Sequence, residues 1–143
     1  MKKVSSILFR KGSDIISVDG STTVLDTLKL MAEKNIGSVV ITENGNYIGL
    51  FTERDYARKV ILMGKSSGET DVKEIMTTGL PRISPDMSIE TCMHILDDNK
   101  IRYLPVFNQQ DELCGIISMG DVVYETIHSQ KEMIEQLHSY IQS

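Results

Sequence analysis

The sequence predicts an α+β fold built from two tandem repeats, each in the order strand, helix, strand, strand, helix. Three observations support this prediction. Apolar residues of the first half recur at a nearly constant distance in the second half, each half passes from a helical to a strand period at the same place, and an Asn-Gly pair separates two strand-like runs. Because one such repeat leaves an apolar sheet face uncovered, we expect the two repeats to pack sheet to sheet.

The repeat can be followed position by position. Val24 matches Ile89, 65 residues later, and after one extra residue in the second loop Gly49 matches Gly115, 66 residues later. This correspondence predicts one module with four parts: repeat 1 at 1–63, a flexible linker containing Gly and Ser at 64–71, repeat 2 at 72–130, and a C-terminal helical extension at 131–143.

Each predicted helix has a local start. Thr23 precedes apolar residues at helical spacing from Val24, so it is expected to cap a helix there, and the second repeat begins its matching helix after Ser88. The closing helices are expected after Thr52 and Ser118. A short helical turn opens each repeat, at 4–8 and 72–76.

The predicted strands come in matched sets. β-rich runs occupy 38–42 and 47–51 in the first repeat and 103–107 and 113–117 in the second. Asn44-Gly45, between the first two runs, predicts a tight hairpin turn. The first strand of each repeat is expected near 15–18 and 82–83, which would give three strands per repeat.

Composition restricts the class of protein. The 143 residues are 41% hydrophobic and 24% charged, as in ordinary globular domains, and the formal net charge of −5 disfavours binding to duplex nucleic acid or to an anionic membrane. Two cysteines are too few for a disulfide framework, no apolar run approaches a membrane span, and the apolar stretch near the N-terminus is too short for a signal peptide. A cytoplasmic location is expected.

A polar motif occurs in both repeats. A Gly, two apolar residues, a Ser or Thr, any two residues and an Asp end the first repeat's hairpin at Thr52 and Asp55, and the second's at Ser118 and Asp121. These residues lie where a strand passes into a helix, so they could simply cap the helix. Alternatively, the carboxylate could accept both hydrogen bonds of a vicinal diol while N–H groups at the helix start receive phosphate oxygens. Capping does not explain Gly120, a poor residue to start a helix.

The doubled motif, together with the run from Ile101 to Val106, resembles the CBS domain pair (Bateman module) of the stand-alone bacterial type, over nearly the whole chain. The resemblance implies a pseudo-twofold module, often dimeric, whose two clefts bind adenosine-containing ligands such as AMP, ATP or NAD, with the motif Asp at the ribose and the Ser or Thr near the phosphates. It implies that the ligand-binding residues are Ile16, Val18, Gly37, Ser38, Thr52, Arg54, Asp55, Arg58, Arg102, Tyr103, Pro105, Ser118, Met119, Gly120 and Asp121.

The two implied sites are not equivalent. Arg54 lies inside the first motif, where the second has Gly120, so it is the better phosphate candidate, whereas Arg58 and Lys59 could be the solvated face of the closing helix. Pro105 is expected at a sheet edge because it has no N–H to donate. We therefore expect unequal binding at the two sites.

The expected function is that of a non-enzymatic adenine-nucleotide sensor that acts on an unknown protein target in signal transduction, without a catalytic cofactor. Two alternatives remain: a structural homodimer with vestigial clefts, and a small nucleotide-hydrolysing enzyme. No GxSxG, HExxH or Walker pattern is present, so no catalytic residue is assigned. Cys92 and His94 do not share a helix face, so no metal site is expected.

The closing helix of the second repeat is expected to continue through the C-terminal extension. Apolar residues recur along it as far as Ile141, well beyond the length of the first repeat's closing helix. Such a stripe either folds back on its own module or packs on a second copy of the chain, which predicts a homodimer.

Overall fold

The computed structural model describes residues 2–12 and 14–142, which fall into two compact units. The first-repeat unit holds residues 15–80, and the second-repeat unit holds 81–142 together with the described residues before 15. Helix α1 (Val4–Lys11) therefore belongs to the unit of the second repeat, while the 3-10 turn η2 (Val72–Glu74) belongs to that of the first. The opening segment of each sequence repeat therefore belongs to the compact unit of the other repeat.

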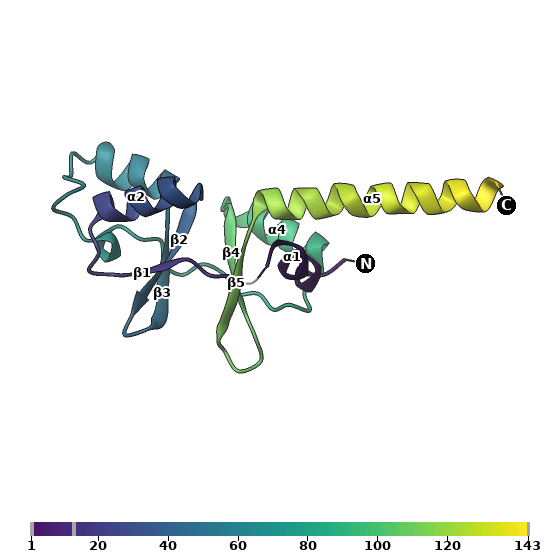
Figure 1. Ribbon diagram of the computed structural model, residues 1–143, viewed down its shortest axis with the longest axis horizontal. Coiled ribbons are helices and arrows are strands. Elements are labelled where there is room, and N and C mark those ends of the chain that lie inside the picture. The colour runs from purple at the N-terminus through teal and green to yellow at the C-terminus, as the bar shows by residue number, and fades with distance from the viewer. Residues whose placement is uncertain (1, 13, 143) are drawn as a thin grey trace. The chain divides into compact units, whose positions relative to one another are not determined.

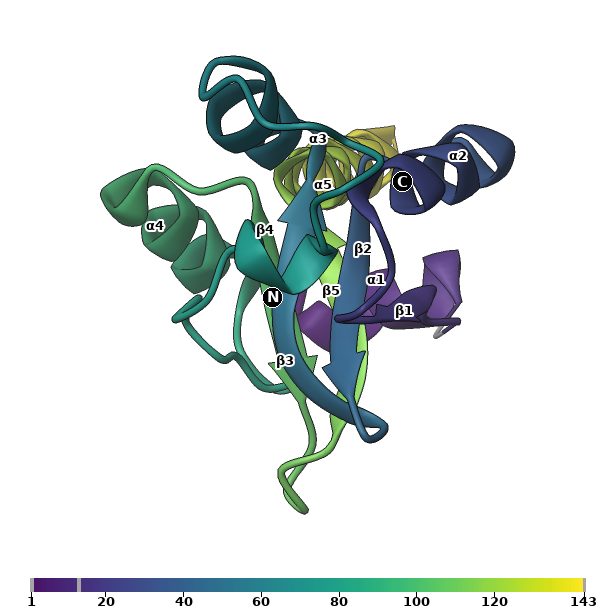
Figure 2. The same cartoon turned by 90° about the vertical axis from the view of Figure 1, so that its left-hand side faces the viewer.

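The first-repeat unit contains a three-stranded sheet in the order β1-β2-β3 (Figure 2). Strand β1 (Ser17–Asp19) pairs parallel to β2 (Ser38–Glu43), and β2 pairs antiparallel to β3 (Asn46–Thr52). Asn44 and Gly45, with φ of 52° and 79°, form the tight hairpin that the sequence predicts. Thr77 extends the sheet by exchanging backbone hydrogen bonds with Leu50 of β3.

Helices cover this sheet and close its core. Helix α2 (Val24–Lys34) begins where predicted, with the Thr23 hydroxyl accepting a hydrogen bond from the Asp26 N–H. The closing helix is short: one α-turn, α3 (Glu53–Asp55), continues as the π-helix η1 (Tyr56–Ile61). The buried apolar core of this unit consists of Val24, Met31, Val39, Ile41, Phe51, Val60, Val72 and Ile75.

The second-repeat unit has a hairpin of β4 (Tyr103–Phe107) and β5 (Leu113–Ser118), packed by α4 (Ile89–Asn99) and α5 (Met119–Gln142). The Ser88 hydroxyl accepts a hydrogen bond from the Thr91 N–H, so α4 is also capped as predicted. Its buried apolar core consists of Val4, Ile7, Ile83, Ile89, Cys92, Leu96, Leu104, Val106, Ile117 and Val122.

The third strand expected in this unit is reduced to one residue, so the expectation of three full strands was wrong here. Ile83 donates to the Pro105 carbonyl and accepts from the Phe107 N–H, as a single parallel bridge. Extending the bridge backward would require N–H groups on Pro81 and Pro105, and extending it forward would require one on Pro85. The three prolines of the chain therefore stop this strand, and Pro105 lies at the sheet edge as expected.

The two matched glycines are explained by the exchanged opening segments. A Cβ on Gly49 would lie 2.9 Å from the Thr77 carbonyl oxygen, and one on Gly115 would lie 2.5 Å from a methyl carbon of Leu8. Within each unit, an opening segment thus packs directly against the strand that leads to the Asp motif. The repeated glycine is the residue that permits this contact.

Helix α5 continues to Gln142, as the sequence predicts, and runs on past the other elements of its unit (Figure 1). Its large apolar residues beyond Gln130 are exposed, from 58% for Leu137 to 81% for Tyr140. The alternative that this stripe folds back on its own module was therefore wrong. Among the described residues, no helix is both long and apolar enough to cross a membrane.

Candidate functional site

Two polar turns occupy the strand-to-helix junctions. The Asp55 turn (Thr52–Asp55) joins β3 to α3, and the Asp121 turn (Ser118–Asp121) joins β5 to α5. In each turn the hydroxyl accepts from the Asp N–H, at 3.1 and 3.0 Å, and the carboxylate accepts from the Ser or Thr N–H, at 3.0 and 2.9 Å. The capping role is therefore confirmed for both motifs.

Capping leaves limited room for anion binding by the backbone. The Glu53 N–H donates to the Gly37 carbonyl and the Met119 N–H to the Arg102 carbonyl. Within the described part of the chain, only the N–H groups of Arg54 and Gly120 lack a recorded acceptor in these first turns. Each helix start therefore offers one such N–H group to a phosphate oxygen.

Asp55 is buried and has contacts on both carboxylate oxygens. Oδ2 accepts from the N–H and hydroxyl of Thr52, while Oδ1 accepts from the Thr77 hydroxyl at 2.7 Å and lies 3.0 Å from Lys59 Nζ. The side chain is 7% exposed. A ligand diol would have to displace at least one of these partners.

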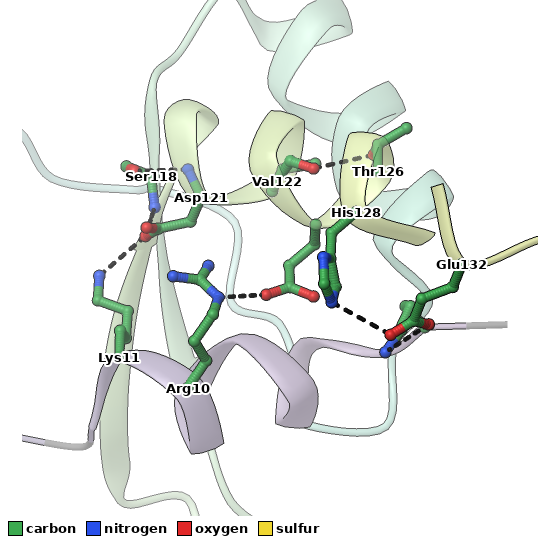
Figure 3. A network of polar contacts seen from close by, with 10 residues as sticks. Arg10, Lys11, Ser118, Asp121, Val122, Thr126, His128 and Glu132 are labelled. Carbon is green, nitrogen blue, oxygen red and sulfur yellow. Dashed lines mark hydrogen bonds and ion pairs between the residues drawn. The ribbon is translucent and has the colours of Figure 1, made fainter. Parts of the chain in front are cut away.

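The Asp121 side chain is more exposed than that of Asp55, and Figure 3 shows Lys11 and Ser118 beside it. Its recorded contacts all fall on Oδ2, which accepts from the Ser118 N–H at 2.9 Å and from Lys11 Nζ at 2.8 Å. The side chain is 19% exposed. Burial acts to raise the pKa of Asp121, but the hydrogen bonds from Lys11 and Ser118 and the Lys11 charge outweigh it and hold the pKa below its usual 3.8. Near neutral pH this side chain is thus an ionised hydrogen-bond acceptor.

Gly120, beside this carboxylate, is exposed, and a Cβ there would meet only the Ser118 hydroxyl, at 3.6 Å. Packing therefore does not require a glycine at this position, in contrast to Gly49 and Gly115.

The remaining predicted residues divide between the two units. Beside the Asp55 turn, Gly37 accepts from Glu53 and Ser38 pairs with Thr52 across the hairpin. Beside the Asp121 turn, the Arg102 carbonyl accepts from Met119 and Tyr103 pairs with Ser118. The other five are placed as follows: Ile16 and Val18 pack against the core of the first-repeat unit, Pro105 is buried in β4, and Arg54 and Arg58 are exposed, as is the Arg102 side chain.

Three contact residues were missed by the motif analysis. Lys59, interpreted as a surface residue, pairs with Asp55, and its spacing of four residues from that carboxylate was the available signal. Thr77 and Lys11 come from the opening segments, 22 and 110 residues from the carboxylates that they contact. No local pattern indicates contacts at that separation.

Each unit also has an open pocket. One of about 480 Å³ lies between α2 and the start of the closing helix and is lined by Leu28, Met31, Ala32, Asn35, Ile36, Gly37, Glu53 and Tyr56. Another of about 550 Å³ lies between α1 and α5, beside Arg10 and Glu125. Neither is lined by Asp55 or Asp121. Among the described residues, no three His, Cys, Asp or Glu side chains gather to hold a metal.

Comparison with known proteins gives a consistent result. The model of the CBS domain matches residues 4–61 and 72–127. The chain is 36% identical to the mitochondrial CBS domain-containing protein CBSX3 of Arabidopsis thaliana, covering 97% of this chain and 71% of the relative.

Solved structures agree. A protein with CBS domains from Burkholderia ambifaria MC40-6, assigned to signal transduction, superimposes with a TM-score of 0.85 at 39% identity, covering 90% of this chain and 96% of that one. A hexameric CBS-CP12 protein from bloom-forming cyanobacteria superimposes with a TM-score of 0.77 at 28% identity, covering 92% and 75%.

Proposed function

The chain belongs to the CBS-domain family, and from this premise we propose that it is a non-enzymatic sensor of adenosine-containing nucleotides that transmits its state to a partner protein. The observation that carries the proposal is the Asp121 turn. It presents an ionised carboxylate with one oxygen engaged, a lysine beside it, and an exposed glycine next to it in the chain.

The chemistry of this turn suits a ribose. A carboxylate oxygen accepts hydrogen bonds from hydroxyl groups, and a charged acceptor makes such bonds stronger than a neutral one does. All recorded contacts of Asp121 use Oδ2, so Oδ1 is the atom that we assign to the ribose hydroxyls. Gly120 would let the sugar approach without a side chain between.

Lys11 is the phosphate candidate at this turn. Its ammonium group donates to Asp121 and to the Ile116 carbonyl, and the side chain is about one-third exposed. An ammonium group so placed can attract a phosphate that follows the ribose. At the other turn Lys59 has the corresponding position beside Asp55, with Arg54 and Arg58 exposed nearby.

The two turns should bind unequally. Asp55 is more buried than Asp121, and both of its oxygens already have partners. We therefore assign the stronger ligand contact to Asp121. The same observation favours the second candidate function, a structural module with a vestigial site, for the Asp55 turn alone.

We further propose that the chain is a homodimer, acts in the cytoplasm, and passes its signal through a change of dimer geometry or of the surface offered to its target. Among the described residues, fourteen large apolar side chains are exposed, and eight of them lie on α5. Exposed apolar surface on this scale is typical of an interaction face. No catalytic residue is proposed.

A thermal-shift series tests the sensor function. At a dissociation constant of about 10 µM, 1 mM AMP stabilises the folded chain by about 2.7 kcal/mol, which should raise Tm by several degrees. AMP, ATP or NAD should give this rise and GMP a smaller one, and no phosphate should be released from ATP. Equal shifts with AMP and GMP would contradict adenine recognition, and steady phosphate release would support an enzyme instead.

A further inference from the structure

Helix α5 has a seven-residue repeat on its exposed side. An isoleucine occurs every seven residues, at Ile127, Ile134 and Ile141. We call these the first core positions, and the residues four places before them the second core positions. The six positions, which we call the α5 seam, are Val123, Ile127, Gln130, Ile134, Leu137 and Ile141. The apolar members are between 43% and 80% exposed. Alternating steps of four and three residues are the pattern of a coiled-coil seam.

Helix α5 packs on its own unit through a different side from the α5 seam. Val122 is fully buried, Glu125 bonds to Arg10 of α1, and Glu132 lies 3.5 Å from Lys2 (Figure 3). Glu125 and Glu132 occupy the heptad position opposite the seam. The α5 seam therefore points away from the elements on which α5 packs, and a second helix could reach it.

We propose that the α5 seam pairs with the seam of a second copy, as a parallel and in-register two-stranded coiled coil. This proposal rests on the homodimer proposed above and specifies how the two helices pair. Isoleucine fills every first core position, and valine and leucine fill two of the three others. β-Branched residues at the first position with leucine at the second favour two parallel strands.

Gln130 decides the orientation. In a parallel pair, Gln130 faces Gln130 of the second copy, and the two amides can donate to and accept from each other. In an antiparallel pair, each first core position faces a second one, so Gln130 would lie against an isoleucine and lose its hydrogen-bond partner. Because burying an unpaired amide is unfavourable, the polar layer favours the parallel pair.

The flanking positions agree with this orientation. In the parallel pair, Lys131 lies near Thr126 of the second copy, and His138 lies near Met133, so no like charges meet. The acidic residues Glu125, Glu132 and Glu135 all occupy outer positions. In an antiparallel pair centred near Lys131, the two lysines would face each other.

Sedimentation velocity on the full chain tests the interface. Ile134→Asp should weaken dimerisation at least 100-fold, because it places two carboxylates in one core layer. Gln136→Asp, which adds the same charge at an outer and exposed position, should leave the dimer unchanged. Circular dichroism checks that both variants fold. A wild-type chain that is monomeric at tens of micromolar, or a dimer insensitive to Ile134→Asp, would overturn the proposal.

Cysteine cross-linking tests the orientation. Under mild oxidation, Ile127→Cys and Leu137→Cys should each form a disulfide-linked dimer alone, whereas Glu135→Cys and the wild type should not. A link that forms only when the Ile127→Cys and Leu137→Cys chains are mixed would mean antiparallel pairing and would overturn the proposal. The Ile134→Asp variant should still show the AMP-induced rise in Tm, so failure of the seam and failure of nucleotide sensing give different results.

Discussion

Replacing Asp121 by alanine is expected to weaken AMP binding by one to two powers of ten or more. A hydrogen bond to a charged group contributes about 1.5 to 3 kcal/mol, and each 1.4 kcal/mol is a factor of ten in the dissociation constant. The variant also loses its half of the capping box, so a modest decrease in stability, of about 1 kcal/mol, is expected with it. Titration at a temperature well below Tm separates the two effects.

Asp55→Ala is the matched control for this expectation. It removes the same carboxylate from the same motif, but from a buried position where Thr52, Thr77 and Lys59 are its partners. We expect the larger loss of stability and the smaller loss of affinity. If Asp121→Ala leaves the affinity for AMP and NAD within twofold of wild type while circular dichroism shows an intact fold, the carboxylate serves only as a cap.

The second large effect concerns the Arg10–Glu125 pair, which ties α1 to α5. Glu125 is 3% exposed and accepts from Arg10 Nε at 2.5 Å, while the guanidinium group lies 4.3 Å from the centre of the Tyr124 ring. Arg10→Met leaves this carboxylate buried without its cation. Since Arg10 itself is about one-third exposed, we expect a loss of roughly 2 to 3 kcal/mol, below the roughly 3 to 5 kcal/mol for a fully buried pair.

The double variant Arg10→Met with Glu125→Leu is the control. An apolar pair of similar size usually replaces a buried ion pair at little cost, so much of the stability should return. Urea denaturation of the two variants and the wild type provides the comparison. A single variant within about 0.5 kcal/mol of wild type would show that α1 is not held to α5 by this pair.

Local patterns were enough to predict most of the elements. Thr23 and Ser88 cap their helices, Asn44-Gly45 turns the first hairpin, and the heptad-like stripe continues to the end of α5, each because the determinant lies within a few residues. The single-residue strand at Ile83 could also have been derived, since the spacing of the three prolines removes the N–H groups that a longer strand requires.

The contacts around the two carboxylates could not be predicted in the same way. Lys11 and Thr77 reach Asp121 and Asp55 because the opening segments are exchanged between the repeats, and the internal repeat alone does not reveal that exchange. The two matched glycines indicated this exchange only indirectly. A glycine kept at Gly49 and Gly115 indicates a close neighbour, but does not identify it.

Isothermal titration calorimetry of the full chain with AMP, with GMP as the control, tests the central claim most directly. The account predicts saturable heat with AMP at a dissociation constant in the micromolar range, about −8 kcal/mol, with one strong site per chain, and weaker binding of GMP. Absence of saturable heat with AMP, ATP and NAD up to millimolar concentration, on protein shown to be folded, would contradict it.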